Sequence, residues 1–242
     1  MTEQFTKASP RLKARMAGVF EALEGAGSAG GQVAIRGRLV VTGNAAATAT
    51  NILGHEQLFI LGFAFSLLAV AFHLVWAFLF YDLLKSVNRS VSLLATFVIL
   101  VGCAVQAVTS LLYLAPLLIL QAGSSLSAFT PHQLQDLSLM FLNLNELAFQ
   151  IYLVFFGLWC VLIGYLIFRS TFLPRILGVL LAIDGVGWML YLSPPLANQL
   201  FPLIAIASGL AEIPLMLWLL IVGVNAVRWK EQAGAAWEFL RT

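Results

Sequence analysis

Five carboxylates lie within stretches of the sequence that are otherwise apolar enough to cross a membrane. These acids are Glu21, Glu24, Glu146, Asp184 and Glu212. An ionisable group in hydrocarbon costs several kcal/mol, so such residues usually face the interior of a helical bundle or a wet cavity. No Lys or Arg accompanies them at similar depth in the predicted spans. The acids therefore predict a cavity that binds a cation, protons or a small polar molecule.

Other polar residues share helical faces with these acids. Asn143, Glu146 and Gln150 are three and four residues apart, which places them on one face of a helix. His73 is the only imidazole in the middle of a predicted span. The candidate residues for ligand binding or an ion pathway are Glu146, Glu212, Asn143, Gln150, Asp184, Glu21, Glu24 and His73.

Glu146 and Glu212 are the strongest of these candidates, because each has a polar neighbour one helical turn away. We expect both to point into the bundle. Each acid could instead be a neutral group that hydrogen-bonds a neighbouring helix and stabilises the fold without binding a ligand. Three functions stay open: a protein that binds or transports a small solute, cation or proton; a non-catalytic membrane interaction or sensory component; and an intramembrane metal-dependent enzyme.

Signatures of catalysis are sparse. His55-Glu56 lacks the second His of an H-E-x-x-H metal motif, and the chain has no G-x-S-x-G elbow or phosphate-binding loop. A three-ligand metal site from His73, Glu146 and Glu212 is conceivable, but residue spacing does not test it. We therefore predict no catalytic residue and no metal site, and the sequence names no cofactor.

The composition is that of a membrane protein. Of the 242 residues, 61% are hydrophobic and only 10% are charged, whereas soluble domains carry roughly 25% charged residues. The lipid bilayer is thus the expected partner, together with a small polar ligand or cation. A net charge of +2 gives no reason to expect nucleic acid, and the sequence does not set the oligomeric state. Cys103 and Cys160 both lie in apolar spans, so we expect no disulfide framework.

The predicted fold is an all-α integral membrane bundle of six transmembrane helices. A helix needs about 20 mostly apolar residues to cross the hydrocarbon. Segment 14–35 is rich in glycine, and its small residues would allow close packing against the other helices. The predicted spans are about 14–35, 58–81, 92–120, 141–168, 173–192 and 201–224. They form a domain over residues 14–225, between a basic tail at 1–13 and a C-terminal tail at 226–242.

The distribution of Lys and Arg predicts that both termini are cytoplasmic. With six spans, only Arg36 and Arg38 lie on the outer side, against eleven basic residues inside. If segment 14–35 did not cross, the ratio would be seven to six, which is no bias. The eleven inner residues are Lys7, Arg11, Lys13, Arg15, Lys85, Arg89, Arg169, Arg175, Arg228, Lys230 and Arg241.

Several connections carry recognisable helix signals. Asn44 can cap a short external helix that Gly54 ends. Thr130-Pro131 with Gln133 resembles a capping box, which would start a helix that runs on into span 141–168. Pro174 is expected to start the fifth span, and the Ser193-Pro194-Pro195 run to stop it.

Four runs of sequence resemble a known family. They are VFFGLWCVLIGYLIFRSTFLPRILGVLLA (154–182), GRLVVTGNAAATATNIL (37–53), FYDLLKSVNRSVSLLA (80–95) and LWLLIVGVN (217–225). They are similar to the bacterial membrane proteins grouped as domain-of-unknown-function family 4386, over about residues 14–226.

The resemblance implies about six helices and a multi-pass location in the bacterial inner membrane, with no established activity. Glu146 and Glu212 match acidic positions of the family. Two features depart from it: segment 14–35 is less apolar than the usual first span, and Trp159 replaces a His that relatives often carry.

Overall fold

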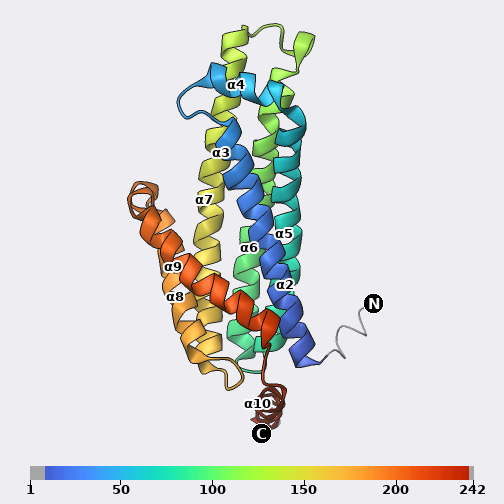
Figure 1. Cartoon of the computed structure of the whole chain (residues 1–242), viewed down its shortest axis with the longest axis vertical. Coiled ribbons are helices and arrows are strands. Elements are labelled where there is room, and N and C mark those ends of the chain that lie inside the picture. Colours follow the sequence, from blue (N-terminus) through green and yellow to red (C-terminus); the bar gives the residue numbers. More distant parts are fainter. Residues whose placement is uncertain (1–8, 240–242) are drawn as a thin grey trace. The chain divides into compact units, whose positions relative to one another are not determined.

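The structure is a computed structural model that describes residues 9–239, and these residues form helices and no strand (Figure 1). The helices in chain order are α2 (Pro10–Ser28), the π-helix η1 (Ala29–Ile35), α3 (Arg36–Leu39), α4 (Ala45–Gly54), α5 (Glu56–Leu84), α6 (Arg89–Leu120), the 3-10 helix η2 (Gly123–Leu126), α7 (Pro131–Arg169), α8 (Arg175–Met189), the 3-10 helix η3 (Leu190–Leu192), α9 (Pro194–Ile221) and α10 (Ala226–Phe239). Lys7 and Arg241, which enter the predicted charge bias, lie outside the described residues.

Five segments of the described chain are long and apolar enough to cross a membrane, which supports a multi-pass membrane protein. These segments are α5, α6, α7, α8 together with η3, and α9. They coincide with the five apolar spans predicted from the sequence. Helix α9 begins earlier than expected, because Pro194 and Pro195 fit the first turn of a helix, where their missing N–H groups cost nothing.

The first predicted span is helical, but it is not one of the five apolar segments. Helical structure runs without a break from Pro10 to Leu39 through the π-helical turn η1. Crossing by this helix, and the orientation of the termini, therefore remain predictions. Both predicted tails contain helical residues, because α2 starts at Pro10 and α10 lies within 226–242.

The predicted caps are confirmed. Asn44 Oδ1 accepts a hydrogen bond from the Ala47 N–H at 2.9 Å and so starts α4. Thr130 and Gln133 cap α7 reciprocally: the Thr130 N–H donates to Gln133 Oε1 at 2.8 Å, and the Gln133 N–H donates to Thr130 Oγ1 at 3.3 Å. These bonds satisfy N–H groups that have no partner within the helix.

The chain divides into two compact units, which we describe separately. Unit 1 comprises residues 1–22, 73–102 and 151–242, and unit 2 comprises residues 23–72 and 103–150. Helices α2, α5, α6 and α7 contribute residues to both. All described basic residues that were predicted to be cytoplasmic belong to unit 1, whereas Arg36 and Arg38 belong to unit 2.

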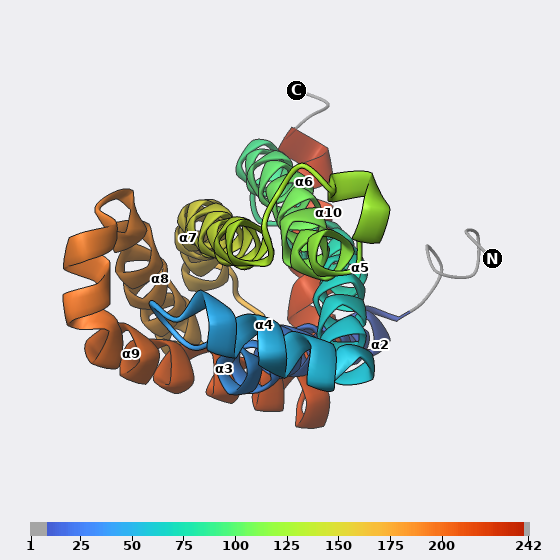
Figure 2. The same cartoon turned by 90° about the horizontal axis from the view of Figure 1, so that it is seen from above.

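In unit 1, α8 lies between α7 and α9, and α8 and α9 form a hairpin (Figures 1 and 2). Two pairs of glycines bring the backbones of α7 and α8 together. A Cβ on Gly157 would lie 2.5 Å from the Gly185 carbonyl oxygen, and one on Gly164 would lie 2.6 Å from the Gly178 carbonyl oxygen. Only glycine allows such close approach of two helices.

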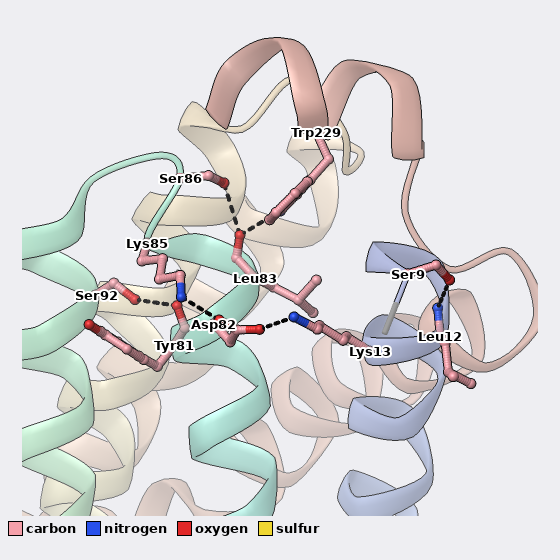
Figure 3. Close-up of polar contacts among 10 residues, drawn as sticks. All are labelled: Ser9, Leu12, Lys13, Tyr81, Asp82, Leu83, Lys85, Ser86, Ser92 and Trp229. Carbon is pink, nitrogen blue, oxygen red and sulfur yellow. Dashed lines mark hydrogen bonds and ion pairs between the residues drawn. The ribbon is translucent and has the colours of Figure 1, made fainter. Parts of the chain in front are cut away.

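A small ion-pair network joins α2 to α5 in unit 1 (Figure 3). The Asp82 carboxylate lies between the ammonium groups of Lys13 and Lys85 and accepts a hydrogen bond from each. Nearby, the Arg15 guanidinium donates to the Ile221 carbonyl oxygen at the end of α9 at 3.3 Å. The N-terminal half of α2 is thereby tied to α5 and α9.

Unit 2 has a core formed by parts of η1, α3, α4, α5, α6 and α7. Its buried residues are Ile35, Leu39, Ile52, Phe59, Tyr113, Leu117 and Leu142. Phe59 of α5 stacks on Tyr113 of α6, with ring centroids 4.6 Å apart, and these helices run side by side in Figure 2. The Asn145 side chain of α7 donates to the Thr109 carbonyl oxygen of α6 at 2.9 Å.

Candidate carboxyl site in unit 1

Three carboxyl groups from three helices gather around a buried thiol in unit 1. Asp184 of α8 is fully buried, and polar groups beside it belong to Glu212 of α9, Cys160 of α7 and Trp188 of α8. The Cys160 thiol is beside Asp184, and the electrostatic effects of Glu212 and of Glu21 of α2 also reach it. The structure therefore brings together three of the acids that the sequence identified one by one.

Local packing explains how Asp184 reaches this position. Its neighbour Gly185 lies against the α7 backbone at Gly157, so α8 passes close to the face of α7 that carries Cys160. A larger residue at 185 would push the two helices apart and move the carboxyl group away from the thiol. The glycines thus set the geometry of the site as well as the packing of the helices.

Glu212 is held within its own helix. Ser208, one turn earlier, donates its hydroxyl to Glu212 Oε1 at 2.8 Å, which confirms the predicted polar neighbour. Pro214 follows two residues later inside α9 and lacks the N–H that would bond to the carbonyl oxygen of Leu210. The helix around Glu212 therefore has a weaker backbone hydrogen-bond ladder than its flanks.

The electrostatics of this group are unusual for a helical interior. Glu212 acts electrostatically on Asp184, and Asp184, Glu212 and Glu21 all act on Cys160. Neighbouring carboxylates repel one another when both are ionised, and burial increases that cost. Within the described residues, no group of three or more His, Cys, Asp or Glu side chains is arranged to hold a metal ion.

Glu146 has a different environment from the one we expected. The Arg36 guanidinium donates to Glu146 Oε2 at 2.8 Å and to the Leu142 carbonyl oxygen at 3.3 Å. The expectation that no basic residue accompanies the acids is wrong at this position. Arg36 follows directly after the predicted span 14–35, and Glu146 lies near the start of 141–168, so the two residues share the same depth. The Glu146 side chain is 51% exposed.

The remaining polar candidates are dispersed. Glu24 is buried and accepts a hydrogen bond from the Ser28 hydroxyl at 2.8 Å within α2. On α7, Asn143 is exposed and Gln150 is buried, so the predicted stripe does not face one environment. Asn145, which the sequence analysis did not select, is the buried amide of this region and bonds to α6.

His73 lies in an aromatic cluster. Its Nδ1 is 3.1 Å from the Tyr152 hydroxyl, and its ring centroid is 4.9 Å from Trp76 and 5.3 Å from Trp159. Of the residues from which the sequence left a three-ligand site conceivable, His73 contacts Tyr152 in unit 1 and Glu146 pairs with Arg36 in unit 2.

Sequence reasoning missed Cys160 and Trp188, whose side chains lie beside the Asp184 carboxyl group. A signal for Cys160 was present. Gly157 and Gly164 are seven residues apart and mark the face of α7 that allows close packing, and Cys160 lies between them. No comparable pattern points to Trp188.

Comparison with known proteins identifies a family. The family described as "Domain of unknown function (DUF4386)" matches residues 16–223. The chain belongs to this family. The match confirms the resemblance seen in the four sequence runs, and it contains Glu21, Asp184 and Glu212. Comparisons with curated proteins and with solved structures gave no significant match. The function of this DUF4386 protein must therefore be argued from its own residues.

Proposed function

We propose that this protein binds and releases protons at the cluster of Asp184, Glu212 and Glu21, and couples that step to the binding or transport of a small solute or cation. The observation that carries the proposal is the meeting of carboxyl groups from α2, α8 and α9, which act on one another and on the Cys160 thiol. Carboxyl groups in apolar segments commonly serve proton relays in pumps and transporters.

The proposed setting is a bundle of six spans in a bacterial inner membrane, with both termini inside. The span that is added to the five apolar segments is the first helix that the structure describes, from Pro10 to Leu39. Its support comes from the charge distribution, because the described basic residues predicted to be cytoplasmic all belong to unit 1. In this topology the cluster of Asp184, Glu212 and Glu21, which come from three of the spans, lies within the membrane.

Infrared difference spectroscopy tests the proton-binding step directly. Purified protein in lipid is compared at acidic and neutral pH, and the C=O stretching band of protonated carboxyl groups is recorded. We expect a band that is lost or shifted in Asp184→Asn and in Glu212→Gln. Asp136→Asn is the matched control, because Asp136 is an exposed acid that pairs with His132 at the start of α7.

Coupling to transport needs a second measurement. Liposomes that carry the protein contain a pH-sensitive dye, and a membrane potential that is negative inside is imposed. The wild-type protein should then admit protons, and Asp184→Asn should abolish this flux. The control variant Asp136→Asn should retain it. A carboxyl band that persists unchanged in both cluster variants would contradict the proton site itself, whereas a lost band without any flux would contradict only the transport step.

A second function has one observation in its favour. Glu146 is paired with Arg36 and Glu24 is hydrogen-bonded by Ser28, so two of the five acids have partners that stabilise the fold. A non-catalytic interaction or sensory component could use all five in this way. Under that function, neutral variants of Asp184 and Glu212 would change stability alone and leave no protonation signal to lose.

A further inference from the structure

A pocket in unit 1 is lined both by apolar side chains and by arginines. It has a volume of about 620 Å³ and lies where the end of α9, the loop before α8 and the start of α10 meet the first turn of α2. Trp218, Val222 and Phe172 contribute apolar surface, and Arg11 and Arg228 contribute positive charge. Both arginines are exposed.

A second pocket, of about 710 Å³, adjoins the first. The two share Thr171, Leu173 and Arg228, and the second adds Arg175 and Glu231. Three arginines thus line the combined site against one carboxylate. Because a guanidinium group can donate two parallel hydrogen bonds, arginines suit the paired oxygens of phosphate and carboxylate groups.

The two principal arginines are held in place by contacts in the wall of the first pocket and by the anchoring of their helices. Arg11 begins α2, which the ion pair between Lys13 and Asp82 ties to α5 (Figure 3). Gly223 packs against Arg11 and has a φ of +72°. A Cβ at position 223 would lie 3.1 Å from Arg11 Cγ. A glycine at 223 therefore lets the chain turn sharply beside Arg11 and form one wall of the first pocket.

Arg228 is positioned by the anchoring of α10. The Trp229 indole N–H donates to the Leu83 carbonyl oxygen of α5 at 2.9 Å, a contact visible in Figure 3. Asn225 caps the helix, since its Oδ1 accepts from the N–H groups of Val227 and Arg228 at 3.2 Å each. The start of α10 is thus fixed at the pocket, with Arg228 presented to it.

We propose that the two pockets bind the phosphate group of an anionic phospholipid, with Arg11 and Arg228 as its principal contacts. The apolar residues of the first pocket favour a lipid over a fully soluble anion. Trp218 lies within α9, one of the segments apolar enough to cross a membrane, so the pocket opens beside surface that would meet acyl chains. Basic pockets at the ends of membrane helices commonly bind anionic headgroups.

Thermal unfolding in detergent tests this proposal. Phosphatidylglycerol should raise the Tm of the purified protein, whereas phosphatidylcholine, which has no net charge, should not. Arg11→Gln and Arg228→Gln should each weaken the effect, with apparent affinity about five-fold lower for each charge removed. Arg38→Gln is the matched control, because it removes an exposed arginine that belongs to unit 2. It should leave the response unchanged.

Glycerol 3-phosphate distinguishes a lipid from a free phosphate compound. An equal rise in Tm with this soluble compound would overturn the assignment to lipid, and no rise would support it. A full response to phosphatidylglycerol in the Arg11→Gln, Arg228→Gln double variant would overturn the site. Native mass spectrometry of retained phosphatidylglycerol gives the same comparison without relying on stability, so a variant with altered Tm is still informative.

Discussion

The partners of each acid, more than its depth, distinguish the candidate residues of this protein. Asp82 is balanced by two lysines and Glu146 by Arg36, whereas Asp184 and Glu212 face other carboxyl groups. Charge balance is what a structural acid needs in a poorly solvated place. Neighbouring carboxylates repel one another when both are ionised, and taking up a proton or another cation relieves that repulsion, which is why the proposed function rests on Asp184 and Glu212.

The Asp82 network should respond very unequally to neutral substitutions of Asp82 and of Lys85. Asp82→Asn removes the carboxylate that lies against the buried Lys13 ammonium group, and we expect a loss of about 3–5 kcal/mol in the free energy of unfolding. Lys85→Met should cost less than about 1 kcal/mol, because the Lys85 side chain is 43% exposed. Denaturant or thermal unfolding in detergent measures both. Equal losses would show that burial does not decide the energy of this network.

The pair of Arg36 and Glu146 offers a comparison in unit 2. Arg36 is only 16% exposed at its side chain and also bonds to the Leu142 carbonyl oxygen, whereas Glu146 is half exposed. Arg36→Met should therefore destabilise the protein more than Glu146→Gln, which should cost roughly 1 kcal/mol or less. A double-mutant cycle measures the coupling of the two groups. A larger effect of Glu146→Gln would indicate a role for this acid beyond the ion pair.

At the scale of helices, glycine positions decide which faces pack. The small residues of segment 14–35, which we expected to allow close packing, include Gly18, Ala22, Gly25 and Ala29 at intervals of three and four. In the structure Gly18 packs against Leu220 of α9, but nothing lies within 4 Å of a Cβ on Gly25. Gly27 and Gly31 instead contact α5. Spacing alone indicates which residues share a face, and it does not say where along the helix a neighbour crosses that face.

Adding a methyl group at the crossing of α7 and α8 should be costly. Gly164→Ala would place a Cβ 2.6 Å from the Gly178 carbonyl oxygen, and backbone has little freedom to move away. We expect a loss of roughly 1–3 kcal/mol, as overpacked interiors usually show. Gly209→Ala in α9 is the control, because nothing lies within 4 Å of its Cβ. It should be neutral or gain up to about 1 kcal/mol from helix propensity. Similar Tm values for both variants would contradict this packing.

For the whole molecule, the sequence predicted what depends on local pattern. The five apolar helices, the Asn44 cap and the Thr130–Gln133 capping box are confirmed, because each follows from residues close together in the chain. The pairing of Arg36 with Glu146 joins residues 110 apart, and such contacts leave no periodic signal. For the same reason the acids could be identified singly, while their grouping around Cys160 could not.

The orientation of the chain is the prediction with the widest consequences, because it decides whether the helix from Pro10 to Leu39 is a sixth span. Single cysteines at Ser9, Ala46, Ser125 and Gly234 sample four exposed positions, and the native Cys103 and Cys160 are buried. With both termini inside, a membrane-impermeant thiol reagent applied to intact cells should label positions 46 and 125. Positions 9 and 234 should react only after the cells are opened. Labelling of position 9 together with 46 would show that the first helix does not cross, and the basic residues around Arg11 would then face the opposite side from Arg228. The proposed lipid pocket needs Arg11 and Arg228 at one membrane surface. It therefore requires that the cysteines at positions 9 and 234 react from the same side.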